Sequence, residues 1–505
     1  MRPQSVAVLL AAAAASLTLP PAAVDAAAPT AISPGHGARI DTVVIEGNTR
    51  TRTEIVRREL LFDVGDLIDS SLVAESERNL RRLPYLGNAR VDLRQDAGTT
   101  VAQVAVDDLY SRALSPQFAG DLDELSYGLS GLDYNFLGRG QTVELAAYRD
   151  AVSGNSASAY YHVPRFRRSD VNATLLARAG EEGHDLGLGL SRPFRALSDS
   201  WSFGLALTRS REVRRLYDRE RLTARYSDRI DQGSIWLSHS NGSRLKLRLT
   251  ISISVSDRRF ASEDEALPYA PADRRRLLAG AGILLWQPRY AVARYVHGLG
   301  RTEDLQTGSW ASLSVTMSTR RLVSDRDFTV FRLGLAPRYS LADRIFLFGS
   351  MNIAGRRERH DLINRTAVAQ LRLYARLLAA HSAALRLRYD AIDDPEDQAQ
   401  FLLGTLRGLR GYAPRRFDGS RRILFNLEAR PTFYHHPLFV LAGALFVDAG
   451  RAWNPGSAGQ VKWGFGAGGR IGLPRVYKNP VMRADLAYGA ADRVWQLSVG
   501  IGQYF

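Results

Sequence analysis

The stretch from Arg244 to Ser256 alternates large aliphatic residues with polar or charged ones. The aliphatic positions are Leu245, Leu247, Leu249, Ile251, Ile253 and Val255. At the helical period these side chains would spread around all sides, whereas in a β-strand they share one face. The other face carries Arg244, Lys246, Arg248, Thr250, Ser252 and Ser254. The pattern therefore predicts a strand with one apolar and one polar face.

The same alternation recurs to the end of the chain, in strands expected at 371–377, 385–389, 423–429, 439–447, 461–471, 482–488 and 495–505. A soluble β-sandwich can also alternate, but here arginines stand where a sandwich needs a dry interior. A membrane β-barrel suits both faces, because its outside meets lipid and its lumen is wet. Residues 109–505 are expected to form this antiparallel barrel, with room for about sixteen strands of roughly ten residues each.

The N-terminus has the pattern of an export signal. Arg2 precedes an apolar run from Val6 to Leu19, and an alanine-rich stretch follows. The run is too short to cross a bilayer as a helix. We therefore expect residues 1–26 to be a secretory signal peptide and residues 27–38 to be a linker.

Composition narrows the classes of function further. The 505 residues include no cysteine, which excludes disulfides, thiolate catalysis and cysteine metal sites. The net charge of +15 would suit nucleic acid, but an exported chain rarely meets it. We expect no nucleic-acid partner, and we interpret the charge as a basic lumen and rim beside the anionic phosphates of outer-membrane lipid and lipopolysaccharide.

Residues 39–108 predict a small α+β domain ahead of the barrel. Strand-like alternation at 40–46 ends at Gly47-Asn48, and Thr51 or Thr53 can begin a short helix. A second helix is expected from Asp69 or Ser70 to Leu83, followed by strands at 89–94 and 100–107. The order strand, helix, helix, strand, strand is that of one compact α+β unit.

This segment resembles the polypeptide-transport-associated (POTRA) domain. The resemblance is carried by the turn and by the approach to the second strand, at Gly47, Asn48, Leu83, Tyr85 and Gly87. It implies a periplasmic domain that receives client polypeptides by strand addition at a sheet edge. The alternative from the residues alone is any small periplasmic docking domain.

A loop rich in glycine and arginine follows the strand expected at 385–389. It contains Arg410, Gly411 and Tyr412, and an exposed loop is its simplest interpretation. Two carboxylates, Glu428 and Asp448, fall on the lumen side of the next two expected strands. A guanidinium inserted into the barrel would need such partners, because an unpaired buried charge is costly.

Glycines line the inner face of the strand expected at 461–471, at Gly464, Gly466 and Gly468. Glycine weakens a strand unless another backbone must approach closely. We therefore expect the lumen on this side to receive the inserted loop that carries Arg410. The last expected strand, 495–505, also carries small residues inward, with Phe505 on its outward face.

Leu409-Arg410-Gly411-Tyr412 resembles the loop signature of the outer-membrane protein-assembly and two-partner-secretion superfamily, which includes the BamA- and TamA-like surface antigen barrels. Phe446 to Gly450 resembles that family's Phe-x-Asp-x-Gly strand, and the terminal Phe505 resembles its insertion signal. The resemblance implies that Arg410 pairs with Asp448 and Glu428 inside the lumen. Leu409 in place of valine and the single POTRA-like domain depart from the family pattern.

No enzyme motif in the sequence is expected to act. Gly464, Gly466 and Gly469 match a dinucleotide fingerprint, but Pro474 follows where a helix would have to open. His435 and His436 lack the helical spacing or clustered carboxylates of a metal site. We expect no catalysis, no cofactor and no metal.

The sequence thus favours an outer-membrane polypeptide translocase or insertase whose N-terminal domain lies in the periplasm. Its expected partners are an unfolded or outer-membrane polypeptide client and periplasmic chaperones or accessory proteins. Two alternatives stay open: a passive transport channel with a periplasmic docking domain, and a structural barrel that moves nothing.

Overall fold

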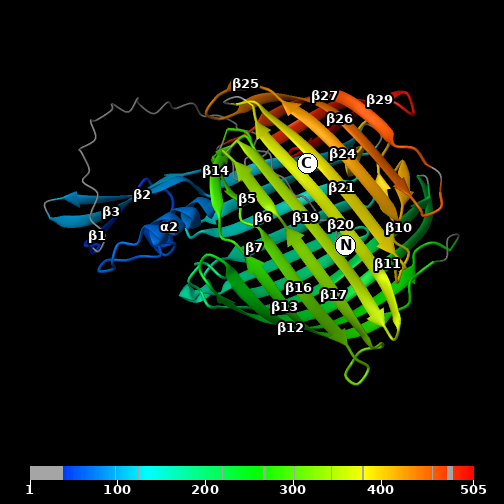
Figure 1. Ribbon diagram of the computed structural model, residues 1–505, viewed down its shortest axis with the longest axis horizontal. Coiled ribbons are helices and arrows are strands. Elements are labelled where there is room, and N and C mark those ends of the chain that lie inside the picture. Colours follow the sequence, from blue (N-terminus) through cyan, green and yellow to red (C-terminus); the bar gives the residue numbers. More distant parts are fainter. Residues whose placement is uncertain are drawn as a thin grey trace.

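The protein consists of a small N-terminal α+β domain set against one end of a β-barrel (Figure 1). The computed structural model describes residues 38–505 apart from 97, 122–123, 219, 266–268, 301, 343, 378–379, 458 and 475–480. The predicted signal peptide and residues 27–37 of the predicted linker lie outside the described residues. Among those described, no helix is long and apolar enough to span a membrane.

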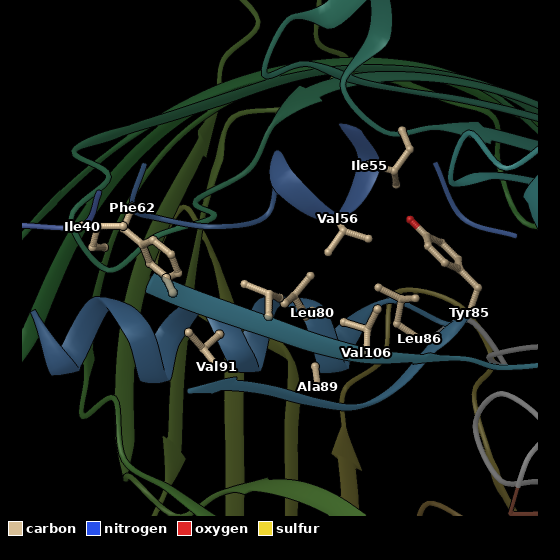
Figure 2. Packing of buried hydrophobic residues seen from close by; sticks show 12 residues of the cluster. Ile40, Ile55, Val56, Phe62, Leu80, Tyr85, Leu86, Ala89, Val91 and Val106 are labelled. Atoms are coloured by element: carbon tan, nitrogen blue, oxygen red, sulfur yellow. The ribbon is translucent and has the colours of Figure 1, made fainter. Parts of the chain in front are cut away.

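The N-terminal domain has the predicted order of elements. These are β1 (Thr42–Glu46), α1 (Thr53–Arg57), α2 (Ser70–Arg82), β2 (Leu86–Asp96) and β3 (Thr99–Asp108), with the sheet ordered β1-β3-β2. The Asp69 side chain caps α2 by accepting a hydrogen bond from the Ser71 backbone N–H. Both helices pack apolar residues onto one face of the sheet, where Val56, Leu80 and Val106 are buried (Figure 2).

The barrel is closed, antiparallel and made of 20 strands. Its segments are β4 (Arg112–Asp121), β5 (Leu125–Phe136), β6 (Gln141–Asp150), β7 (Gly154–Val163), β8 (Asn172–Gly180), β9 (Gly183–Arg192), β10 (Trp201–Asp218), β11 (Arg221–Asn241), β12 (Lys246–Ser262), β13 (Arg274–Trp286), β16 (Trp310–Ser318), β17 (Phe328–Ala336), β18 (Arg338–Leu341), β19 (Ile345–Glu358), β20 (Asp361–Arg376), β21 (Ser382–Asp393), β24 (Arg421–Arg430), β25 (Thr432–His435), β26 (Val440–Trp453), β27 (Lys462–Gly472), β28 (Val481–Gly489) and β29 (Val494–Ile501).

Two strands of the barrel are interrupted by proline. Pro337 separates β17 from β18, and both segments pair with β19; Pro431 separates β24 from β25, and both pair with β26. Proline has no N–H to donate to the ladder, so each break falls where the pairing must lapse.

The expected number of about sixteen strands is therefore wrong. The estimate allowed each strand a long connection, whereas several connections are short turns, such as 151–153, 181–182 and 359–360. The residues saved in turns form additional strands, and the barrel is correspondingly wider.

The two faces of the barrel wall differ as the alternation predicts. On β12, Leu249 and Ile251 are 46% and 61% exposed on the outer face, whereas Lys246 on the inner face is 4% exposed. Outward aliphatic side chains recur on β10, β11 and β13. The exposed apolar band is the surface that lipid covers in a membrane barrel.

The N-terminal domain lies across the barrel mouth at which β5, β7 and β9 end. Hydrogen bonds or ion pairs join Thr51 to Asn135, Arg52 to Gly138, Glu75 to Leu197 and Glu59 to Arg165. Figure 1 shows α2 and the domain's sheet beside this end of the barrel. We call this mouth the domain end and the opposite mouth the far end.

A pair of adjacent substitutions on β12 tests the assignment of faces. Ile251→Arg is expected to destabilise the folded barrel in lipid by about 2–4 kcal/mol, because it places a guanidinium in the lipid-facing band. Ser252→Arg, one residue further on the lumen face, is the matched control and is expected to cost much less. Urea unfolding in phospholipid vesicles measures both, and equal losses would contradict the facing.

Candidate functional site

The connection between β21 and β24 folds back into the barrel from the far end. It contains β22 (Phe401–Leu403), the short 3-10 helix η2 (Thr405–Arg407) and β23 (Phe417–Gly419), and β22 pairs with β23. We call residues 394–420 the inner loop. Leu403, Leu409 and Tyr412 of this loop are fully buried and pack with Leu424 of the wall. The loop therefore has its own apolar anchor inside the lumen.

Arg410 of the inner loop is fully buried and is held by carboxylates of the barrel wall. Its Nε and Nη2 donate to the two oxygens of Asp448 at 2.7 and 2.9 Å, a bidentate pair. Its Nη1 donates to Glu428 at 2.6 Å and lies 3.6 Å from Asp485. The structure thus brings Arg410, Glu428 and Asp448 together, as the sequence resemblance implies.

Aromatic rings enclose the same guanidinium. The ring of Phe446 lies 3.4 Å from the Arg410 guanidinium carbon, and the ring of Tyr504 lies 4.0 Å from it. The Tyr504 hydroxyl accepts from the Gly408 N–H and donates to the Thr405 carbonyl. The guanidinium is therefore bound by carboxylates and covered by aromatic rings. These interactions compensate for the hydration that it loses on burial.

Glycine permits the backbone of the inner loop to reach the wall. Gly411 has a φ of +86°, and a Cβ there would lie 2.7 Å from backbone atoms of β28. A Cβ on Gly464 would lie 2.2 Å from the Arg410 carbonyl oxygen. Either substitution would push the loop away from the wall.

The other predicted glycines serve neighbouring contacts. A Cβ on Gly466 would meet the ring of Phe446 at 2.9 Å, and one on Gly468 would meet the Asp485 carboxylate at 2.1 Å. Gly450 lies against Leu424 and Leu403. Among the three predicted glycines of β27, therefore, only Gly464 faces the inner-loop backbone directly; the other two lie against β28 and the side chains that surround Arg410.

Tyr412, the last residue of the Leu409–Tyr412 motif, anchors the inner loop to the wall. Its hydroxyl donates to the Trp463 carbonyl at 2.7 Å and accepts from the Ala491 N–H at 3.1 Å. Its ring meets Phe417 edge to face. The loop is thus tied to β27 and to the turn after β28 as well as to the carboxylates.

The site contains residues that the sequence analysis missed. Asp485 and Arg470 form an ion pair at 2.6 Å beside Arg410, and Asn426 donates to Asp448 and to the Gly408 carbonyl. The lumen parity of β24, β27 and β28 could have indicated these three. Nothing in the sequence indicated Tyr504, since it was assigned to a strand.

The predicted strand 495–505 is wrong in its last four residues. Strand β29 ends at Ile501, and Gly502 has a φ of +91°, which turns the chain inward. Phe505 therefore does not face lipid: its ring lies 5.1 and 5.3 Å from the guanidinium carbons of Arg386 and Arg430 in the lumen. Its role as an insertion signal stays a prediction.

Two of the three wall carboxylates around Arg410 have other cationic partners. Glu428 pairs with Arg430 and Arg470, and Asp485 pairs with Arg470 and Arg483. In the described part of the chain, Asp448 has an ion pair with Arg410 alone. Withdrawal of Arg410 would therefore leave mainly Asp448, among these three carboxylates, without its cation.

Among the described residues, no three histidine, aspartate or glutamate side chains converge in a way that could hold a metal ion. The site holds the inner loop in the lumen by ion pairs, hydrogen bonds and apolar packing.

Comparisons with known proteins agree with the N-terminal assignment. The POTRA family model, described as "Surface antigen variable number repeat", matches residues 38–107, which confirms the resemblance of this domain. No curated protein sequence matches the chain.

Solved structures of similar architecture include BamA from Haemophilus ducreyi lacking POTRA domains 1-3, with 13% identity over 92% of this chain and 84% of that chain at a TM-score of 0.44. CdiB from Acinetobacter baumannii has 13% identity over 92% of this chain and 74% of that chain, also at 0.44. CdiB from Escherichia coli has 10% identity over 95% and 93% at a TM-score of 0.40.

Removal of one partner from the Arg410–Asp448 pair should destabilise the barrel by about 3–5 kcal/mol, because the other charge stays buried and loses its bidentate partner. We expect this for Arg410→Ala and for Asp448→Ala, and we expect the double variant to lose less than the sum. Urea unfolding in lipid vesicles measures all three.

Arg416→Ala is the matched control in the same loop. Arg416 pairs with Asp492 at 2.9 Å, but both side chains are partly exposed, so its loss should cost about 0–1 kcal/mol. Strict additivity of Arg410→Ala and Asp448→Ala would contradict the coupling between the loop and the wall.

Proposed function

We propose that this chain, a POTRA-domain barrel resembling the outer-membrane protein-assembly and two-partner-secretion superfamily, is an outer-membrane polypeptide translocase or insertase. The POTRA domain would lie in the periplasm and receive an unfolded client. The barrel would then pass the client through its lumen or release it sideways into the membrane.

The observation that carries the proposal is the inner loop held in the lumen by Arg410. A passive pore has no need of a buried arginine, two aromatic faces and a glycine-lined wall in its path. The other arginine partners of Glu428 and Asp485 support withdrawal of Arg410 as a reversible step. A closed lumen that can open suits a channel that must wait for its client.

The position of the POTRA domain supports delivery of a client. Its contacts with the turns after β5, β7 and β9 place it over the mouth, and strand β2 is at the outer position of the sheet order β1-β3-β2. An outer strand can add a further strand by main-chain hydrogen bonds. A client bound there would already be beside the lumen.

The closing seam of the barrel supports sideways release. Among the described residues, strands β29 and β4 are joined by two residue pairs, Ser498–Asp121 and Val499–Gly120, whereas β28 and β29 are joined by eight. Each lost pair removes main-chain hydrogen bonds, so this seam is the weakest in the wall. It would open at the least cost in free energy.

We further propose that the protein has no catalytic activity and needs no cofactor. The partners that the proposal requires are the polypeptide client and the outer-membrane lipid around the barrel. Periplasmic chaperones that keep the client unfolded would be accessory partners.

Planar-bilayer conductance of the purified protein tests the proposal. We compare the wild type with Arg410→Ala and with a deletion of residues 39–108. The wild type should show small, flickering conductance, and Arg410→Ala should open more often because the loop loses its anchor to Asp448. The deletion should leave the loop in place, and its conductance should stay small.

The matched control is Arg416→Ala, which changes the charge of the same loop at an exposed position. Large and steady conductance in every form would contradict a loop-closed lumen. The passive transport channel would then be the better interpretation.

A further inference from the structure

A second segment fills the lumen, from the domain end. The connection between β13 and β16, residues 287–309, contains a hairpin of β14 (Tyr290–Arg294) and β15 (Thr302–Gln306). We call residues 287–309 the domain-end hairpin. Other connections at this end are short: four residues, 242–245, join β11 to β12. The closure of the wall does not need the hairpin, since Trp286 already pairs with Trp310.

The tip of the hairpin packs on apolar side chains of the lumen wall. Leu299 is 3% exposed and lies in a cluster with Val440, Ala442 and Val481. A Cβ on Gly472 would lie 2.6 Å from that of Leu299. These wall positions face inward on β26, β27 and β28, so the tip reaches across the lumen beneath the site of Arg410.

A second part of the wall, between the strands that carry the hairpin and β26, holds it in the same way. Val296 is 2% exposed and packs with Phe346 and Tyr374 of β19 and β20, and the ring of His297 meets Tyr374 edge to face at 5.0 Å. Apolar and aromatic side chains are unusual in the wet lumen of a membrane barrel. Here they form an apolar surface that the hairpin covers.

One ion pair connects the base of this hairpin to the POTRA domain. Arg81 of α2 donates from Nε and Nη2 to the two oxygens of Asp304 at 2.9 and 3.2 Å. Both side chains are about one fifth exposed. Burial lowers the pKa of Arg81, but hydrogen bonds and charge from Asp304 outweigh it and leave a net rise. Tyr290 adds a second contact, since its hydroxyl accepts from Arg82.

Arg81 also occupies the free edge of β2. Its Nη1 donates to the Ala89 carbonyl at 3.1 Å, and Glu77, its neighbour on α2, accepts from the Val91 N–H at 2.9 Å. Residues 89 and 91 are two apart in a strand, so these main-chain groups point to the same edge. A strand added to β2 at this point would need the same carbonyl and the same N–H.

We propose that the domain-end hairpin is a displaceable plug of the lumen, and that an extended polypeptide pairing with β2 releases it. The incoming strand would replace Arg81 at the Ala89 carbonyl and Glu77 at the Val91 N–H. Arg81 would then lose the position from which it holds Asp304. The release step rests on the proposed function, whereas the plug itself does not.

The space for the incoming strand is present between the two parts. A cavity of about 1420 Å³ separates the POTRA domain from the hairpin, lined by Ala89 and Arg90 on one side and by Val292, Thr302 and Asp304 on the other. A polypeptide held in this cavity would touch β2 and the base of the hairpin together. Once the hairpin is displaced, the apolar surface that it covered would be accessible to apolar side chains of the client.

Planar-bilayer conductance in an Arg410→Ala background tests the plug, because the inner loop is already loosened there. The first variant replaces residues 287–309 with the short turn 242–245 of the same barrel. Its open probability should rise by about tenfold or more over the background, since the second obstruction is gone. The control, Arg289→Lys, changes an exposed residue of the same hairpin that does not line the cavity, and it should leave conductance unchanged.

A reversible lock provides the converse test, since the chain has no cysteine of its own. Leu299→Cys with Gly472→Cys places two Cβ atoms so near that a small shift reaches the disulfide spacing of about 3.8 Å. The oxidised form should hold the background at low conductance, and dithiothreitol should restore it. Unchanged conductance on locking and on hairpin replacement would overturn the plug.

A model client tests the release. The probe is a synthetic peptide of residues 246–256, an alternating strand, added on the domain side; the control peptide has the same composition with apolar and polar residues in separate blocks. The probe peptide should raise the open probability, and the control peptide should not. Asp304→Ala should have the higher open probability even without peptide. The disulfide-locked form should keep its low open probability when the probe peptide is added.

The outcomes separate the two proposals. If hairpin replacement opens the pore but the peptide has no effect in any form, release by a polypeptide is overturned. If labelled peptide binds the wild type and hairpin replacement changes nothing, the plug is overturned while the proposed client function stands.

Discussion

The buried guanidinium of Arg410 sets the condition on which the closed barrel depends. A cation with no exposed surface must have its charge and its hydrogen bonds satisfied within the protein. Three strands of the wall therefore bring Glu428, Asp448 and Asp485 to one place, and Phe446 and Tyr504 cover the faces of the cation. Glu428 and Asp485 have other arginine partners, so the cost of leaving Asp448 without its cation holds Arg410 in place, and a competing cation could release it.

The two obstructions of the lumen use different physics. The inner loop is held mainly by ion pairs between its own residues and residues of the wall. The domain-end hairpin is held by apolar contacts and by one ion pair to the POTRA domain. Ion pairs are specific in geometry but can exchange partners; apolar contacts are insensitive to direction and are lost when a competing apolar segment takes their place. A lumen closed from both ends by different interactions can respond to different events at each end.

Much of the architecture follows from local pattern. The period of two at Leu245 to Val255 identified the lipid face, because lipid and lumen impose opposite polarity on neighbouring residues. The same parity placed Glu428 and Asp448 inside the barrel. It could not supply the number of strands, because that number depends on the length of each turn, and Pro337 and Pro431 break strands without ending them.

By itself, then, the sequence determined the class of fold, the two faces of each strand, the order of elements in the POTRA domain and the pairing of Arg410 with lumen carboxylates. Each of these rests on periodicity or on charge balance, and both can be recognised from residue types and their spacing along the chain. The tertiary structure alone decided the inward turn at Gly502 that brings Tyr504 onto Arg410, the insertion of residues 287–309, and the link from Arg81 to Asp304. These contacts join residues far apart in sequence, and only the closure of the barrel brings them within reach of one another.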